Sequence, residues 1–191
     1  MQRLILLLLL LAGCAGSSKY MTRDETPDAI QAPAGQALIV FVRPSGLGAA
    51  INFTVFDDKG DFVGQVPAKG HVMRAAAPGR HRYVVWAENT AVANVEVAAG
   101  KTYIVEVAAR MGAWAARAHL LPVKRGSKHW DKALAWVKET NEWDTDPELA
   151  QQWKTEKREG LEKQLQRAKD MWAKYDAEEK EKRTMRPDDG R

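Results

Sequence analysis

Cysteine is the scarcest residue in this chain of 191 residues, because Cys14 is the only one. A single thiol excludes an intramolecular disulfide framework and any metal site built from several thiolates. Long apolar runs are lacking as well, since the longest uninterrupted stretch of leucine and isoleucine covers only residues 4–11. A membrane-spanning helix needs about 20 predominantly apolar residues. The composition therefore predicts neither a disulfide-stapled fold nor a spanning helix in this run.

The sequence also lacks the short motifs that mark many enzymes. Ser45 and Ser127 do not lie in a GxSxG nucleophile motif, and no glycine-rich phosphate loop follows a predicted strand. Acidic pairs occur only on charged helical faces, where solvated ion pairs are the usual interpretation. The histidines have neither HExxH nor i,i+4 spacing, which favours scattered histidines over a zinc site; they are His71, His81, His119 and His129. We therefore expect no catalytic residue, no metal and no cofactor.

One acidic cluster, formed by Asp57, Asp58 and Asp61, invites comparison with a calcium loop. An EF-type loop needs oxygen ligands at its first, third and fifth positions and a glutamate at its twelfth. Lys59 occupies the third position here. The stretch 57–60 is therefore interpreted as the tight turn of a hairpin.

The first fourteen residues carry the most specific signal in the chain. A short start with one positive charge, Arg3, precedes the apolar run 4–11, and small residues follow it. This order predicts a secretory signal peptide. The stretch 11–14, Leu-Ala-Gly-Cys, resembles the lipobox of bacterial lipoproteins. The resemblance implies that residues 1–13 are removed and that Cys14 receives a diacylglycerol; the alternatives are a plain signal peptide with an incidental cysteine and an uncleaved anchor.

Residues 14–36 are predicted to be a flexible tether between the lipid and the folded domain, because they are polar, contain two prolines and have no apolar period. Ala15 follows the cysteine in place of the aspartate that resembles an inner-membrane retention signal. We therefore expect the protein in the outer membrane, facing the periplasm and held there by lipid on Cys14. The formal net charge of +4 is modest, and no nucleic-acid partner is expected.

The charge distribution changes near residue 126. Residues 14–126 carry a net charge of +4, whereas residues 127–191 carry −1 and are dense in both signs. This shift predicts a boundary between a β domain at 37–123 and a helical tail at 127–183.

Residues 37–123 have the pattern of an all-β domain. The segment 37–43 is continuously apolar and predicts a buried strand, and the segments 51–56 and 61–66 predict a hairpin. Further short segments alternate between apolar and polar residues and are separated by turns; they cover 71–76, 80–88, 91–97, 102–109 and 113–121. The sequence therefore predicts an independently folding antiparallel β-sandwich, immunoglobulin-like or similar, of about eight strands.

The turns of this domain carry a family resemblance. Phe-Val-Arg-Pro at 41–44, Val-Phe-Asp-Asp-Lys-Gly at 55–60 and the turns at 77–81 and 98–103 resemble a small β-sandwich domain of many bacterial lipoproteins of unknown function, PEGA-like in style. The resemblance covers about residues 37–123. It implies an extracytoplasmic, non-enzymatic module and carries over no catalytic residues.

The apolar period becomes helical after residue 126. A short helix is predicted at 128–138 and a long amphipathic helix at 146–182, which would extend ~55 Å if it were continuous. Five of the seven tryptophans lie in this tail, so they must cover the β domain, each other, a second copy or a partner. Residues 184–191 are predicted to be a disordered end.

One face of the long helix carries a heptad-like apolar seam; it consists of Leu161, Leu165, Ala168, Trp172 and Tyr175. Gly160 is expected to weaken this helix by roughly 1 kcal/mol relative to alanine. Docking on the β domain and capture of an outside partner both remain open for the seam. The partner hypothesis assigns protein binding or self-association to Leu161, Leu165, Trp172 and Tyr175.

Together, these features favour a lipid-anchored cell-envelope protein with a non-catalytic binding or structural role. The β-sandwich would be its scaffold and the helical tail its interaction arm. The alternatives are an envelope hydrolase and a cell-wall-binding protein that uses aromatic and basic side chains, each with a site that is not visible in the sequence. No small-molecule substrate is evident. A cleft with convergent polar groups is the feature that an enzyme would need.

Overall fold

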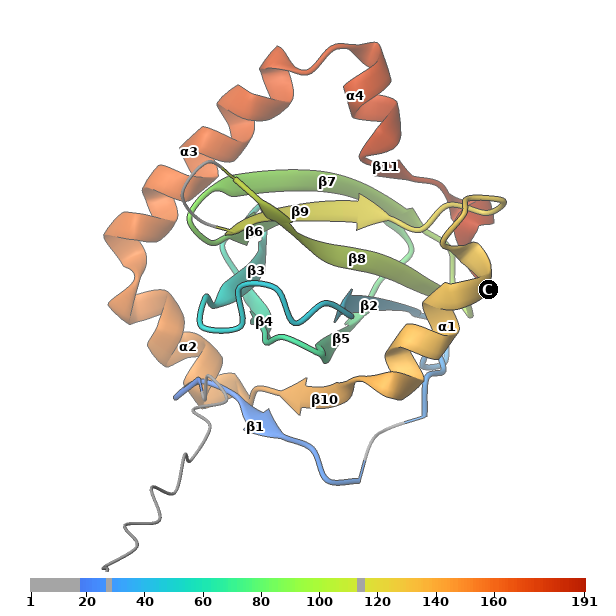
Figure 1. The fold of residues 1–191 in the computed structure, drawn as a ribbon, viewed down its shortest axis with the longest axis horizontal. Coiled ribbons are helices and arrows are strands. Elements are labelled where there is room, and N and C mark those ends of the chain that lie inside the picture. Colours follow the sequence, from blue (N-terminus) through green and yellow to red (C-terminus); the bar gives the residue numbers. More distant parts are fainter. Residues whose placement is uncertain (1–17, 27–28, 113–115) are drawn as a thin grey trace, which may run out of the picture.

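The structure, a computed structural model, describes residues 18–26, 29–112 and 116–191. This part of the chain is mainly β, with helices towards its C-terminal end. The strands lie at the centre of the molecule and the helices are arranged around them (Figure 1).

The described strands form two sheets. One sheet has the order β1 (Thr22–Arg23), β10 (Asn141–Asp144), β5 (Gly70–Ala76), β2 (Ala37–Arg43), β8 (Thr102–Met111) and β9 (Ala116–Pro122). The other has the order β11 (Thr184–Met185), β7 (Thr90–Val97), β6 (Gly79–Trp86), β3 (Phe53–Asp57) and β4 (Phe62–Val66). The strands predicted between residues 37 and 123 correspond to β2 through β9, so the prediction of a β-rich domain is confirmed.

Both sheets are mixed, whereas the sequence predicted an antiparallel arrangement. The strand β2 runs antiparallel to β5 but parallel to β8. The short strands β10 and β11 also pair in parallel, with β5 and β7 respectively. All seven residues of β2 are buried, and all but the last, Arg43, are apolar. Such near-continuous apolar strands are typical of parallel pairing. The apolar run therefore predicted the burial of this strand but not its neighbours.

The main core lies between the two sheets and continues onto the outer face of the five-stranded sheet, beneath C-terminal helices. Phe41 of β2 contacts Tyr83 of β6 edge to face, with their ring centroids 4.9 Å apart. The sheets are also joined through Asn89, whose side chain accepts from the N–H of Ala118 at 2.8 Å and donates to the carbonyl of Ala118 at 2.9 Å. The side-chain amide of Asn89 thereby pairs with the backbone of β9 in the way that a peptide group of a neighbouring strand would.

A second, smaller core lies on the outer face of the six-stranded sheet, beneath α1 (Trp130–Glu139). Leu38 and Val40 of β2 contribute to it from the sheet. Ala133 and Val137 of α1 are buried against this face. The short helix predicted at 128–138 therefore packs on the β domain.

Three helices replace the continuous helix predicted at 146–182, namely α2 (Pro147–Glu156), α3 (Arg158–Lys174) and α4 (Ala177–Lys182). The helical path is interrupted at Lys157 and again at Tyr175, whose backbone is extended. These interruptions let the chain bend around the five-stranded sheet instead of projecting from it (Figure 1). The prediction of one straight helix is therefore wrong.

The predicted tether at 14–36 is also corrected where the structure describes it. Tyr20 and Met21 are only 5% and 6% exposed and belong to the main core, and β1 pairs with β10. The Thr145 hydroxyl donates to the Tyr20 carbonyl at 2.7 Å, and the next residue, Asp146, caps α2. The sequence did not predict this packing, because Tyr20 and Met21 are only two apolar residues in a segment that has no apolar period.

Residues 184–191, predicted to be disordered, form defined structure. The strand β11 adds to the five-stranded sheet beside β7, and Met185 is fully buried. Arg191 exchanges two backbone hydrogen bonds with Thr102, each 3.0 Å long. The Arg191 guanidinium lies 3.7 Å from the centre of the Trp130 ring, which places the chain end beside the start of α1 (Figure 1).

Segments outside 37–123 therefore complete the β domain. The strands β1, β10 and β11 extend the two sheets, and helices from the tail cover their outer faces. The predicted boundary between a β domain and a tail does not separate two structural units. In the part of the chain that the structure describes, no helix combines the length and the apolar character needed to cross a bilayer.

Candidate functional site

The residues singled out in the sequence fall into different parts of the molecule. Cys14 lies outside the described residues. The Asp57 carboxylate accepts from the backbone N–H groups of Lys59 and Asp61, at 2.9 and 2.8 Å, and β3 pairs with β4 across this turn, which confirms the predicted hairpin. Asp61 in turn accepts from Lys154 of α2 at 2.6 Å. Asp57 therefore stabilises the turn, and Asp61 links the turn to α2.

His71 is the most deeply buried of the four histidines, and it lies opposite Glu142 in the pairing of β5 with β10. The Thr140 hydroxyl donates to the Trp136 carbonyl at 2.8 Å, so it accepts from Nδ1–H of His71 at 2.9 Å. Nε2 then carries the lone pair and lies 3.7 Å from the Glu142 carboxylate. Burial lowers the pKa of His71 to about 4, so the ring is neutral at pH 7.

Three carboxylates close to this pair come from distant parts of the sequence. Asp24, Glu142 and Asp144 each bring an oxygen within 4.8 Å of the others. Such oxygen donors are of the kind that Ca²⁺ and Mg²⁺ prefer. Of the three, only Glu142 is buried. A cluster of acidic groups does not by itself define a metal site, and we assign none to it.

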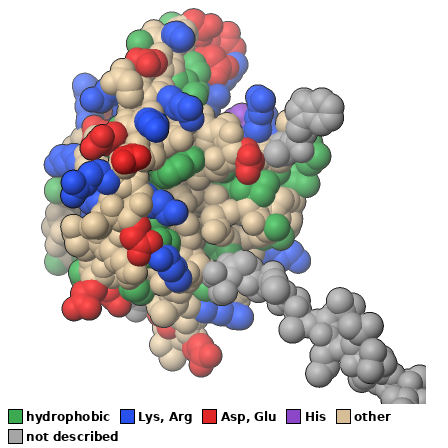
Figure 2. Space-filling model, turned by 90° about the vertical axis from the view of Figure 1, so that its left-hand side faces the viewer, with side chains coloured by type: hydrophobic (Ala, Val, Ile, Leu, Met, Phe, Trp, Pro, Cys, Tyr) green, Lys and Arg blue, Asp and Glu red, His purple; other side chains and the backbone are tan. Residues whose placement is uncertain are grey.

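The apolar seam faces the chain's own five-stranded sheet. Its members are buried or partly buried against the main core: Leu161, Leu165, Ala168, Trp172 and Tyr175. Arg82 of β6 lies 4.9 Å from the centre of the Trp172 ring. The solvent side of α2 and α3 carries intermixed Lys, Arg, Asp and Glu side chains (Figure 2). Capture of a partner by Leu161, Leu165, Trp172 and Tyr175 stays a prediction.

Gly160 has a different role from the one expected. A Cβ atom at this position would lie 2.6 Å from Cη2 of Trp86, which is closer than atoms can pack. The missing side chain therefore admits the tip of the Trp86 indole against α3. The helix-weakening residue predicted from propensity is a point of close contact between α3 and the sheet.

Trp86 is fixed at a second point by Gln164, which is 6% exposed. With its amide oriented to suit its neighbours, Gln164 donates to the Thr90 hydroxyl and accepts from the Trp86 indole N–H at 3.3 Å. The indole is therefore held by a hydrogen bond as well as by the contact with Gly160.

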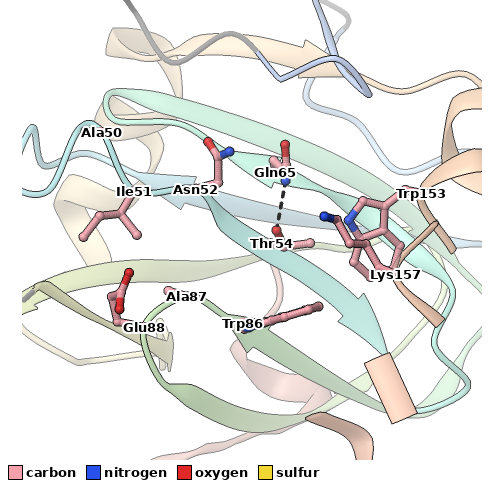
Figure 3. Close-up of a pocket in the computed structure, with 10 residues that line it drawn as sticks. All are labelled: Ala50, Ile51, Asn52, Thr54, Gln65, Trp86, Ala87, Glu88, Trp153 and Lys157. Atoms are coloured by element: carbon pink, nitrogen blue, oxygen red, sulfur yellow. Dashed lines mark hydrogen bonds between the residues drawn. The ribbon is translucent and has the colours of Figure 1, made fainter. Parts of the chain in front are cut away.

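Beside this indole, a groove of about 300 Å³ remains on the outer face of the five-stranded sheet (Figure 3). Its walls come from the segment before β3, from β3 and β4, from the end of β6 and from the junction of α2 with α3. Trp153 closes it on the helix side; this residue is 1% exposed and packs on Phe56 and Phe62, with centroid distances of 5.8 and 4.7 Å. Buried aromatic packing therefore supports the helix side of the groove.

Polar groups from five segments converge on this groove. Gln65 of β4 donates to the Thr54 hydroxyl of β3 at 3.2 Å, and both side chains line the groove (Figure 3). Asn52 lies on the adjoining segment. Glu88 and Lys157 add one charge of each sign, and neither makes an ion pair with another described residue. One aromatic face with a few directed polar groups is the usual composition of a ligand site.

The sequence did not reveal this groove, because its residues lie in segments far apart along the chain. The sequence offered one indication. The alternation in the predicted hairpin places the polar residues Thr54 and Gln65 on its outer face, which the helical tail covers only in part. The interruption at Lys157, which leaves that part uncovered, has no signal in the sequence.

Comparison with known proteins gave no relative for this chain. No protein-family model matches it, and neither a curated protein nor a solved structure gives a significant match. Its function is therefore argued from its own residues.

Proposed function

We propose that the protein is a lipid-anchored protein of the cell envelope, with a non-catalytic binding or structural role. The observation that carries this proposal is the Leu-Ala-Gly-Cys box at 11–14 after a short apolar run. We place it in the outer membrane, facing the periplasm. The two sheets, with a common core between them, are best classed as a β-sandwich in the style of the small PEGA-like lipoprotein domains.

The packing of residues 18–24 refines how such an anchor would hold the domain. The Lys19 ammonium and the Tyr20 hydroxyl both donate to Glu156 of α2, at 2.6 and 2.7 Å. Only four peptide units separate Cys14 from Ser18. At about 3.5 Å per extended residue they reach at most ~14 Å. The α2 side of the molecule would therefore stay close to the bilayer, in place of the longer reach expected of a free tether.

The groove supports a binding role more than a hydrolytic one. Glycosidases use a pair of carboxylic acids on opposite sides of the scissile bond. Among the described residues that line the groove, Glu88 is the one carboxylate. A single carboxylate can hydrogen-bond to a ligand, but it does not supply both members of an acid–base pair.

Metabolic labelling with a palmitate analogue tests the anchor. The wild-type protein should incorporate label and sediment with membranes. Cys14→Ser should abolish labelling and leave an unprocessed precursor, whereas Ser17→Ala, a matched change three residues away, should behave as wild type. A wild-type protein without label would contradict the proposal. Crosslinking of the native lipoprotein in its membrane would then identify any protein partner.

A further inference from the structure

We propose that the groove beside Trp86 binds an uncharged saccharide of one or two sugar rings. This inference rests on the proposed binding role and specifies its ligand class. The groove of about 300 Å³ lies at the small end of the range for ligand sites, which is roughly 300–1,000 Å³. A space of this size suits a short glycan segment better than a folded partner.

The aromatic wall is the first reason for a sugar. A pyranose ring has an apolar face of C–H groups, which packs on an aromatic ring, and a rim of hydroxyl groups. Figure 3 shows the Trp86 indole edge-on along one side of the groove, with Thr54 and Lys157 across from it. Gly160 and Gln164 hold this indole in place, so little side-chain entropy is lost when a ligand packs on it.

The polar wall is the second reason. Sugar hydroxyl groups donate and accept at once, so they need both kinds of partner. Gln65 uses one amide N–H on Thr54, which leaves its carbonyl oxygen, its second N–H and the Thr54 hydroxyl proton for a ligand. Asn52 makes no side-chain hydrogen bond with another described residue, so it offers a further donor and acceptor. These amide groups also match the N–H and carbonyl of an N-acetylamino sugar.

The charge of the groove is the third reason. Glu88 and Lys157 contribute one negative and one positive charge, so that the described residues of the lining carry no net charge. Glu88 would repel a strongly anionic ligand, and Lys157 would repel a cationic ligand. The amide and hydroxyl groups present no long apolar channel for an acyl chain. An uncharged polar ligand with an apolar face, which is the character of a sugar, satisfies all the groups present.

Titration calorimetry of the full-length protein in detergent micelles tests the inference. The probe is N,N′-diacetylchitobiose, with cellobiose as the sugar that lacks N-acetyl groups. We expect saturable binding of the first probe with a millimolar or tighter dissociation constant. Asn52→Ala removes an exposed side chain and should weaken binding by roughly 3- to 10-fold, the equivalent of one neutral hydrogen bond. Gln166→Ala, at an exposed position on α3, is the matched control and should leave binding unchanged.

A second variant distinguishes loss of binding from loss of folding. Trp86→Phe keeps an aromatic ring on the groove wall but removes the larger indole surface, so it should weaken binding while the protein still melts cooperatively. If the wild type binds neither sugar at about 10 mM, the inference is overturned, since even weak specific sites have millimolar dissociation constants. Binding that is unaffected by both variants would place the sugar elsewhere and overturn it as well. Neither result bears on lipid labelling of Cys14, which tests the proposed function separately.

Discussion

At the scale of single residues, contacts decide roles that residue type alone misassigns. Gly160 lies in a helix, where glycine costs roughly 1 kcal/mol relative to alanine, so propensity alone predicts that an added methyl group stabilises the protein. The structure places Cη2 of Trp86 only 2.6 Å from the position of that methyl carbon. The steric conflict outweighs the gain in propensity, because the indole is also hydrogen-bonded to Gln164 and cannot move freely.

Gly160→Ala is therefore expected to lower the free energy of unfolding by about 1–3 kcal/mol, as overpacking of a well-filled contact usually does. Chemical denaturation measures this change. Gly46→Ala is the control, because a Cβ there meets no atom within 4 Å and should leave stability nearly unchanged. A more stable Gly160→Ala protein would show that α3 does not press on Trp86.

At the scale of elements, the helices α2 and α3 are part of the fold through their contacts with the five-stranded sheet. Leu161 is 4% exposed, although it was assigned to a partner-binding seam. Leu161→Ala should cost about 2–4 kcal/mol of stability, the range for truncating a buried leucine. Leu47→Ala, at a leucine that is 38% exposed, should cost far less in the same denaturation experiment. Equal and small effects would mean that α3 does not pack as described.

The N-terminal segment should likewise be held by α2. Hydrogen bonds from Lys19, Tyr20 and Gln152 lower the pKa of the Glu156 carboxyl to about 2. Glu156→Gln should therefore accelerate tryptic cleavage after Lys19, followed by mass spectrometry. Glu178→Gln, which removes an exposed carboxylate within α4, is the control. Unchanged cleavage after Lys19 in Glu156→Gln would show that these bonds do not hold the segment.

The same carboxylate gives a pH dependence. Because the pKa of Glu156 is depressed in the folded protein, its contribution is complete above about pH 4.5 and is lost as the pH falls towards 2. Hydrogen exchange at residues 19–23, corrected for its intrinsic pH dependence, should become faster across that window. In Glu156→Gln the exchange should already be fast at neutral pH. Protection that persists in the wild type at pH 2 would contradict this account.

At the scale of the whole molecule, the described residues form one body. The strands β1, β10 and β11, together with α1, α2 and α3, complete sheets and cores that begin within 37–123. A fragment of residues 37–123 would expose both outer faces of the sheets. We therefore expect that it lacks the cooperative thermal transition of the full-length protein in circular dichroism. A sharp β-type transition in the fragment would contradict this expectation and support the prediction from the sequence that residues 37–123 fold independently.

The extent of sequence-based prediction follows from how local each signal is. The hairpin around Asp57 and the strand β2 were predictable, because turn residues and an apolar run specify them locally. The parallel neighbour of β2, the burial of Met185 and the bend at Lys157 depend on packing between segments that are distant in sequence. The groove was missed for the same reason: Gln65, Trp86 and Lys157 meet only after the tail has folded over the sheet.

The most direct test of the central claim, a lipid-anchored body held close to its membrane, is mass spectrometry of the N-terminal peptide from protein purified out of its native membrane. We predict a chain that begins at Cys14, without residues 1–13, and carries a diacylglyceryl group on the Cys14 sulfur. A chain that retains Met1, or one that begins elsewhere with an unmodified Cys14, would contradict the account.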